Sequence, residues 1–199
     1  MINGPVGQLD TLRLPHSTDG APRGIALVAH PNPTQGGTNT NKVVHTLAKT
    51  LSRLGYIAYC PNLRGVGKSA GEHDHGQGEV DDMAAVYAYV QAEHGTLPIV
   101  LAGFSFGTYV QARLAQRLGE SAIERLIMAG PACGKYAIPH VPADTLVIHG
   151  EQDEVIPLSA VLDWARPQHL PLIVVPGVSH FFHGRLTQLA EIVTHQWRA

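Results

Sequence analysis

One stretch near the middle of the chain constrains the fold more than any other. The apolar run Ile99–Ala102 leads into Gly103-Phe104-Ser105-Phe106-Gly107, and a helical pattern follows to about Leu118. A continuous apolar run of this kind is typical of a buried strand. Glycines two residues before and after a serine are typical of a sharp turn, where a Cβ would meet the neighbouring strand or helix. The stretch therefore predicts a strand, a tight turn that exposes the Ser105 hydroxyl, and a helix.

Strands and helices alternate along the rest of the chain. Alternating apolar and polar residues predict an edge strand at Gln8–Leu14, and apolar runs predict strands at Gly24–His30, Tyr56–Cys60, Ile123–Ala129, Thr145–His149 and Leu172–Val175. Helical spacing of apolar residues predicts helices at Asn41–Leu54, around Val80–Val90, at Leu158–Arg166 and around Leu186–Trp197. Such alternation is typical of βαβ units. We expect one domain over residues 1–199, with an α/β fold, a mostly parallel central sheet and helices on both faces.

The composition excludes several classes of function. A formal net charge of −2 and a pI near 6.6 give no electrostatic basis for binding nucleic acid or an anionic membrane. No signal-peptide pattern and no apolar segment of about 18 residues is present, so we expect a cytoplasmic protein with no membrane partner. Two cysteines, Cys60 and Cys133, form no disulfide framework or metal pattern, and we expect both to be buried.

The residues that follow three predicted strands could act together. In parallel sheets, ligands bind beyond the carboxyl ends of the strands. Ser105, Asp153 and His180 each follow a strand, in the order hydroxyl, carboxylate, imidazole. A serine hydroxyl is a weak nucleophile, an imidazole can take its proton and return it, and a carboxylate can orient that imidazole. We therefore expect these three residues to form a catalytic triad.

Neighbouring residues compete for two of these roles. Glu151 and Glu154 flank Asp153, and the alternative is that all three are solvated loop acids. His183 lies close to His180, but we expect it to start the last helix as an exposed or capping residue. His149 lies inside an apolar strand, so we expect it to be a core histidine or one that supports the site without touching substrate.

A nucleophilic serine also needs donors for the oxyanion that it creates. The backbone N–H of Phe106, directly after the serine, is one candidate. The second is expected in the loop His30-Pro31-Asn32-Pro33, where proline has no N–H and Asn32 is left as the donor. We expect His30 to brace this loop rather than to react.

These motifs together resemble the α/β-hydrolase superfamily over nearly the whole chain, and more narrowly its small lidless bacterial serine hydrolases and esterases related to dienelactone hydrolase. The matching segments are His30-Pro31-x-Pro33, Asn62-Leu63-Arg64-Gly65-Val66-Gly67, the turn around Ser105, His149-Gly150-x-x-Asp153 and Gly177-x-x-His180-Phe181-Phe182. The resemblance implies a hydrolase with Ser105, Asp153 and His180 as triad and Asn32 and Phe106 as oxyanion donors. Dienelactone hydrolases use a cysteine nucleophile, so the serine disfavours that specific chemistry.

The family's usual cap has no counterpart in this chain. Only about 15 residues, Gly130–Asp144, separate two predicted strands where the cap is usually inserted. An open site gives little burial for a long acyl chain, so we expect short-chain or small activated esters as substrates. Phe104, Phe181 and Phe182 are expected to contact them, although one residue of each aromatic pair around the site could instead fill the core.

Two other motifs are weaker. Gly65-Val66-Gly67-Lys68-Ser69 resembles a phosphate-binding loop, but the pattern needs glycine at the position of Asn62. His73-Asp74-His75 lacks a third metal ligand at recognisable spacing. We expect no metal and no cofactor. The sequence favours a serine carboxylic ester hydrolase with a small-molecule ester substrate. A thioesterase, a C–C hydrolase or peptidase with the same triad, and a non-catalytic binding protein are the alternatives.

Overall fold

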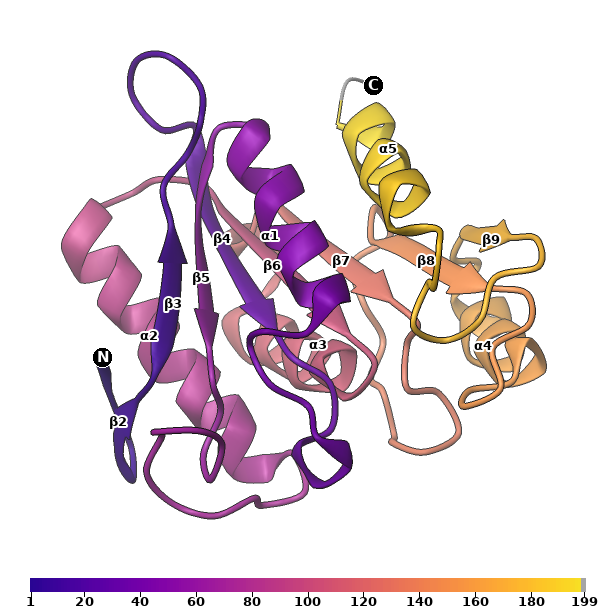
Figure 1. Cartoon of the computed structure of the whole chain (residues 1–199), viewed down its shortest axis with the longest axis horizontal. Helices are drawn as coiled ribbons and strands as arrows, with labels where there is room; N and C mark the ends of the chain where they lie inside the picture. The colour runs from indigo at the N-terminus through magenta and orange to yellow at the C-terminus, as the bar shows by residue number, and fades with distance from the viewer. Residues whose placement is uncertain (198–199) are drawn as a thin grey trace.

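Seven strands form the central sheet of the computed structural model, which describes residues 1–197 (Figure 1). Neighbouring strands are parallel except at one edge, where β3 runs antiparallel to β5. In sheet order the strands are β3 (Thr11–Leu14), β5 (Tyr56–Pro61), β4 (Gly24–Ala29), β6 (Ile99–Phe104), β7 (Arg125–Ala129), β8 (Leu146–Gly150) and β9 (Leu172–Val175). The predicted α/β fold with a mostly parallel sheet is confirmed.

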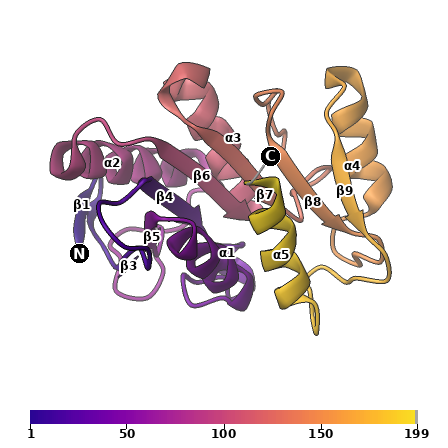
Figure 2. The ribbon, with the colours of Figure 1, turned by 90° about the horizontal axis from the view of Figure 1, so that it is seen from above.

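Helices cover both faces of this sheet (Figure 2). One face packs against α1 (Lys42–Arg53) and α5 (Leu186–Gln196), and the other against α2 (Gln77–His94), α3 (Phe106–Leu118) and α4 (Leu158–Ala165). Short 3-10 turns lie at Pro33–Gln35, Glu120–Ala122 and Arg166–Gln168. The sheet separates two apolar cores. Four of its strands, β4, β5, β6 and β8, are buried along their whole length, which explains why they are largely apolar.

Local signals set the first helix. The side chain of Asn41 accepts hydrogen bonds from the N–H groups of Val43 and Val44, at 2.9 and 3.4 Å, and so caps the start of α1. Gly55, with φ 99°, follows the helix end and turns the chain into β5. These two residues bring β5 back beside β4 and leave the loop after β4 at the carboxyl edge of the sheet.

The amino-terminal segment differs from the prediction. The expected strand Gln8–Leu14 is broken at Asp10, and its first part, β2 (Gly7–Leu9), pairs with an unpredicted strand β1 (Ile2–Gly4) in a separate hairpin. The break has a physical cause. The N–H of Asp10 donates to the Ser69 hydroxyl at 2.8 Å, and its carbonyl accepts the N–H of Asn62 at 2.8 Å. Both backbone groups of Asp10 are thus hydrogen-bonded to residues distant in sequence, and the strand is interrupted there.

The connection between β7 and β8 contains no helix within the described part of the chain. Its only regular feature is an isolated bridge between Cys133 and Tyr136. The chain is therefore lidless, as predicted, and both cysteines are buried. Within residues 1–197, no helix is both long and apolar enough to cross a membrane.

Candidate active site

The turn between β6 and α3 holds Ser105 in a backbone conformation that few residues adopt. Its φ is 52° and its ψ is −121°. A Cβ on Gly103 would collide with the backbone of Gly107 and Thr108, and a Cβ on Gly107 would collide with the carbonyl groups of Ala29 and His30. The expected reason for both glycines is thus confirmed. Backbone strain of this kind is tolerated where the surrounding structure determines it, and it is common at active sites.

Ser105, His180 and Asp153 form a continuous hydrogen-bonded chain. The Ser105 Oγ lies 3.0 Å from His180 Nε2, and His180 Nδ1 lies 2.7 Å from Asp153 Oδ2. All three residues are buried, although Ser105 keeps 8% of its surface exposed. A carboxylate only accepts, so Nδ1 of His180 carries the proton and Nε2 is free to accept from the serine hydroxyl. The structure therefore brings together the three residues that the sequence predicts as a triad.

Backbone groups hold the Asp153 carboxylate in the charged form. Its Oδ1 accepts the N–H groups of Val155 and Ile156 at 2.8 and 2.7 Å. Burial alone would raise the pKa of Asp153, but the hydrogen bonds from His180 and from these N–H groups bring it below the ordinary value of 3.8. The carboxylate can therefore stabilise a positive charge on His180.

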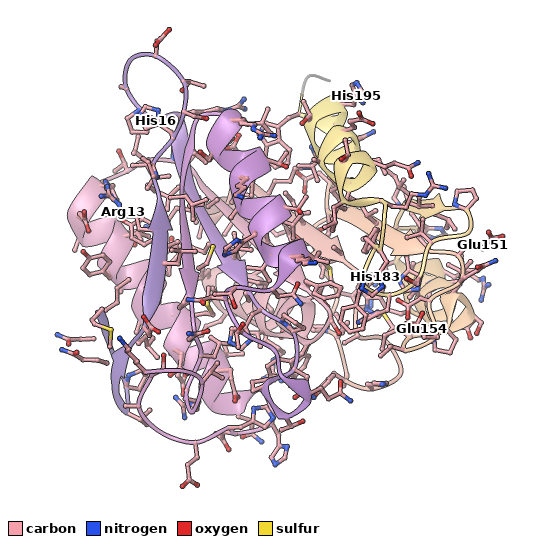
Figure 3. The ribbon with its side chains drawn as sticks, viewed as in Figure 1. Arg13, His16, Glu151, Glu154, His183 and His195 are labelled. Atoms are coloured by element: carbon pink, nitrogen blue, oxygen red, sulfur yellow. The ribbon has the colours of Figure 1, made fainter. Side chains whose placement is uncertain are left out.

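The two neighbouring glutamates do not compete for His180's ring. Glu151 Oε2 accepts the N–H of Gly177 at 2.8 Å, and Glu154 Oε2 accepts the N–H of His180 at 3.2 Å. Both side chains thus join the loop after β8 to the loop after β9 through backbone groups. Glu151, Glu154 and His183 come from these two loops on one side of the molecule (Figure 3). His183 is exposed and lies before α5, so the expectation that it starts this helix is wrong.

The loop after β4 carries the second predicted oxyanion donor. Asn32 caps the 3-10 turn: its Oδ1 accepts the N–H of Thr34 at 2.9 Å, and its Nδ2 donates to the Tyr136 hydroxyl at 3.2 Å. Within residues 1–197, the backbone N–H groups of Asn32 and Phe106 have no hydrogen-bond partner. Both are therefore free to bind an oxyanion. Tyr136 was not predicted, because nothing in the sequence links residue 136 to residue 32.

His30 braces this loop, as expected. Its Nδ1 donates to the carbonyl of Pro31 at 2.7 Å, and its Nε2 accepts the N–H of Leu63 at 3.0 Å. The side chain is fully buried, and this burial lowers the pKa of His30 to about 4. A neutral imidazole therefore ties the end of β4 to the loop after β5.

The predicted substrate-contacting aromatic residues occupy different environments. Phe181 is 39% exposed, and its ring centroid lies 5.0 Å from that of His180. Phe104 is fully buried, with its ring centroid also 5.0 Å from that of His180. Phe182 is 1% exposed and belongs to the core beneath α5. The prediction that Phe104 and Phe182 contact substrate is therefore corrected: both are core residues, and only Phe181 offers surface to a ligand.

The glycine-rich loop after β5 is held by buried charges. Arg64 donates to both carboxylate oxygens of Asp82, at 3.1 and 2.8 Å. Glu79, fully buried, accepts the N–H of Gly76 at 2.7 Å and lies 2.7 Å from His73 Nδ1. No cluster of three or more metal-ligating side chains occurs in the described residues. The ring centroid of His73 lies 5.5 Å from that of Phe106, which places this segment beside the turn after Ser105. No sequence pattern indicates that Glu79, at the start of α2, anchors it.

Solved structures with the same architecture contain related sequences. A lidless α/β serine hydrolase from Xanthomonas campestris is 40% identical, with a TM-score of 0.93 over 99% of this chain and 91% of that one. An α/β serine hydrolase homologue from Coxiella burnetii is 39% identical, with a TM-score of 0.88 over 98% and 94%. An uncharacterised protein from Rickettsia prowazekii is 29% identical over 96% of this chain and 85% of its own length.

A family model agrees with these likenesses. The model described as serine aminopeptidase, S33, matches residues 20–143. This segment includes the loop after β4 and the turn around Ser105, and it makes up more than half of the sequence. The chain therefore belongs to the serine aminopeptidase S33 family of α/β-hydrolases.

Proposed function

We propose that the protein is a serine carboxylic ester hydrolase that cleaves short-chain or small activated esters through an acyl-enzyme on Ser105. The observation that carries the proposal is the continuous chain from Ser105 Oγ to His180 at 3.0 Å and from His180 to Asp153 at 2.7 Å. A hydroxyl, a neutral imidazole and a charged carboxylate in this order are the groups that serine acyl transfer requires.

The proposed reaction uses these groups twice. His180 Nε2 takes the proton of Ser105 as its Oγ attacks the substrate carbonyl, and Asp153 stabilises the imidazolium that forms. The N–H groups of Phe106 and Asn32 bind the oxyanion. The imidazolium then gives its proton to the leaving alcohol, and an acyl-enzyme remains. Water, deprotonated by the same imidazole, attacks this ester, and release of the acid restores the serine.

The surroundings of the serine favour small acyl groups. The connection between β7 and β8 forms no cap, so little apolar surface is available to cover a long chain. Phe181 supplies one exposed aromatic face beside His180. We therefore expect acetyl and butyryl esters to be cleaved faster than decanoyl esters. Thioesters of the same acids use the same groups and remain a second substrate class.

Removal of amino-terminal residues from peptides is a weaker alternative. An aminopeptidase must bind the free α-ammonium group of its substrate, which usually takes an available carboxylate. The carboxylates around the site are already engaged: Asp153 with His180, Glu151 and Glu154 with the loop after β9, and Glu79 with the loop before α2. We therefore expect p-nitroanilides of amino acids to be poor substrates.

One set of assays tests the proposal. A fluorophosphonate probe should label Ser105 covalently, and Ser105→Ala should abolish the labelling. p-Nitrophenyl acetate, butyrate and decanoate, an acetyl thioester and an amino-acid p-nitroanilide should then be compared at equal enzyme concentration. Folded protein that neither reacts with the probe nor cleaves any of these compounds would support the non-catalytic binding protein instead.

A further inference from the structure

The proposed mechanism does not use His149, the fully buried histidine of β8. Its Nε2 lies 3.0 Å from the carbonyl oxygen of Ile156 and 3.5 Å from Asp153 Oδ2. Both of these oxygens accept hydrogen bonds and neither can donate one while Asp153 is charged. The proton of the ring therefore lies on Nε2 and is directed at the loop after β8, which carries Asp153 and Ile156.

Whether His149 is charged depends on whether its other ring nitrogen, Nδ1, also carries a proton. Nδ1 of His149 is buried and has no hydrogen-bond partner among residues 1–197. A proton there would be an unpaired buried donor on a cation, which is costly in an apolar environment. Burial lowers the pKa of His149 below its ordinary value, although Asp153 opposes the shift. At neutral pH the ring is therefore uncharged.

His149 holds the same turn that the carboxylate holds. The N–H of Ile156 donates to Asp153 Oδ1, while the carbonyl of Ile156 accepts from His149. Residue 156 is thus fixed at both of its polar backbone groups. This arrangement directs the remaining oxygen, Asp153 Oδ2, toward His180 Nδ1 at 2.7 Å.

We propose that His149 is a positioning residue for Asp153. Its Nε2–H fixes the turn that aims the carboxylate at His180. Because the His149 ring is uncharged, it does not compete with the His180 imidazolium for the negative charge of Asp153. The expected effect on rate rests on the proposed function, whereas the tautomer and the state of the Asp153–His180 hydrogen bond can be measured in the resting protein.

Two substitutions separate the hydrogen bond from the volume of the ring. His149→Phe keeps an aromatic ring but leaves the Ile156 carbonyl without a donor. His149→Gln places an amide N–H near the position of Nε2 and should restore the contact. We expect kcat for p-nitrophenyl acetate to fall about 10- to 100-fold in His149→Phe, with KM within about twofold, and to recover to within about fivefold in His149→Gln. His45→Phe, on α1, is the control for loss of a partly buried histidine and should keep the parental kcat.

NMR of the whole protein gives a readout that does not depend on turnover. The ¹⁵N spectrum of the imidazole groups should show His149 as the neutral Nε2–H tautomer at pH 7. The low-field proton of His180 Nδ1 should be present in the wild type and His149→Gln and be shifted or lost to exchange in His149→Phe. A wild-type His149 that is charged or protonated on Nδ1 would overturn the inference even if His149→Phe fails to fold.

The outcomes also distinguish this inference from the proposed function. Wild-type protein without ester cleavage or probe labelling would contradict the proposed function, and the NMR experiment would still decide the role of His149. An active wild type whose His149→Phe variant keeps both its kcat and the His180 signal would contradict the inference alone.

Discussion

Two parts of the candidate site are held in place by different kinds of force. The turn around Ser105 is held by steric contact, because Gly103 and Gly107 lie so close to neighbouring backbone that no side chain fits. The loops after β8 and β9 are instead joined by hydrogen bonds, including those from Glu151 and Glu154 to backbone N–H groups. The two glycine positions therefore tolerate no larger residue. The hydrogen bonds between the loops can instead be removed one at a time, and their strength depends on pH.

The largest expected effect tests whether the two parts work as one unit. Ser105→Ala and His180→Ala should each lower kcat for p-nitrophenyl acetate by about 10⁴-fold or more, because the hydroxyl and its base act together. For the same reason the double variant should be little worse than either single one. Ser179→Ala is the matched control on the loop after β9 and should keep the parental rate. Near-parental turnover in either single variant would refute the assignment.

The next prediction compares two acidic residues, Asp153 and Glu154, in the loop after β8. Asp153→Asn should lower kcat by about 10³- to 10⁴-fold, because the amide cannot stabilise the imidazolium and can favour the wrong tautomer of His180. Glu154→Gln should cost less than about tenfold, since an amide oxygen still accepts the N–H of His180. Steady-state kinetics with one ester would measure both values. Equal losses in the two variants would mean that Glu154 also acts through its charge.

The free energy of unfolding should depend more on the sterically held turn than on the hydrogen-bonded loops. Gly103→Ala should lower the free energy of unfolding by about 3 kcal/mol or more, because its Cβ would meet the backbone of Gly107 and Thr108. Glu151→Gln should change stability by less than about 1 kcal/mol, because the contact with the Gly177 N–H can be kept. Urea unfolding of both variants gives the comparison. A Gly103→Ala protein as stable as the wild type would show that the turn can relax, and the steric explanation would then fail.

The last prediction concerns the pH dependence of stability. His30 has a pKa of about 4 in the folded protein and about 6.5 when unfolded, so the unfolded chain binds a proton first as the pH falls. The free energy of unfolding should therefore decrease between pH 6.5 and 4, by up to about 3 kcal/mol from this residue. Burial also lowers the pKa of His149, so this residue likewise makes the folded protein less stable as the pH falls. Asp153, whose folded pKa lies below 3.8, adds stability that is lost only at still lower pH.

Urea unfolding at several pH values between 7.5 and 4 would measure this dependence. His30→Gln removes one titrating group, so its stability, although lower at pH 7, should change less between pH 6.5 and 4. A variant with the same slope as the wild type would exclude His30 as a source of the acid sensitivity.

Most elements were predictable because their signals are local. The apolar run of β6, the close approach of Gly103 to Gly107 and Thr108, and the cap Asn41 each involve residues within a few positions of one another, so the sequence carries their physical cause. The order of Ser105, Asp153 and His180 was predictable for a related reason. Parallel strands deliver the residues that follow them to one edge of the sheet, whatever the details of packing.

Other features depend on partners far away in the chain. The break at Asp10 is caused by Ser69 and Asn62, and the environment of Asn32 includes Tyr136. The burial of Phe182 beneath α5 follows from how the last helix packs on the sheet. No local pattern reveals the contacts of Asp10 and Asn32, because each of them joins segments separated by tens of residues.

The sequence by itself determined the α/β architecture, the strained turn at Ser105 and the set of groups available for chemistry. Only the tertiary structure decided which aromatic residue stays exposed and what the two glutamates beside Asp153 contact. The physical reason is that Asp153, Glu151 and Glu154 are alike in sequence but differ in the oxygen–nitrogen contacts they make, and those contacts exist only once β8 and β9 lie side by side.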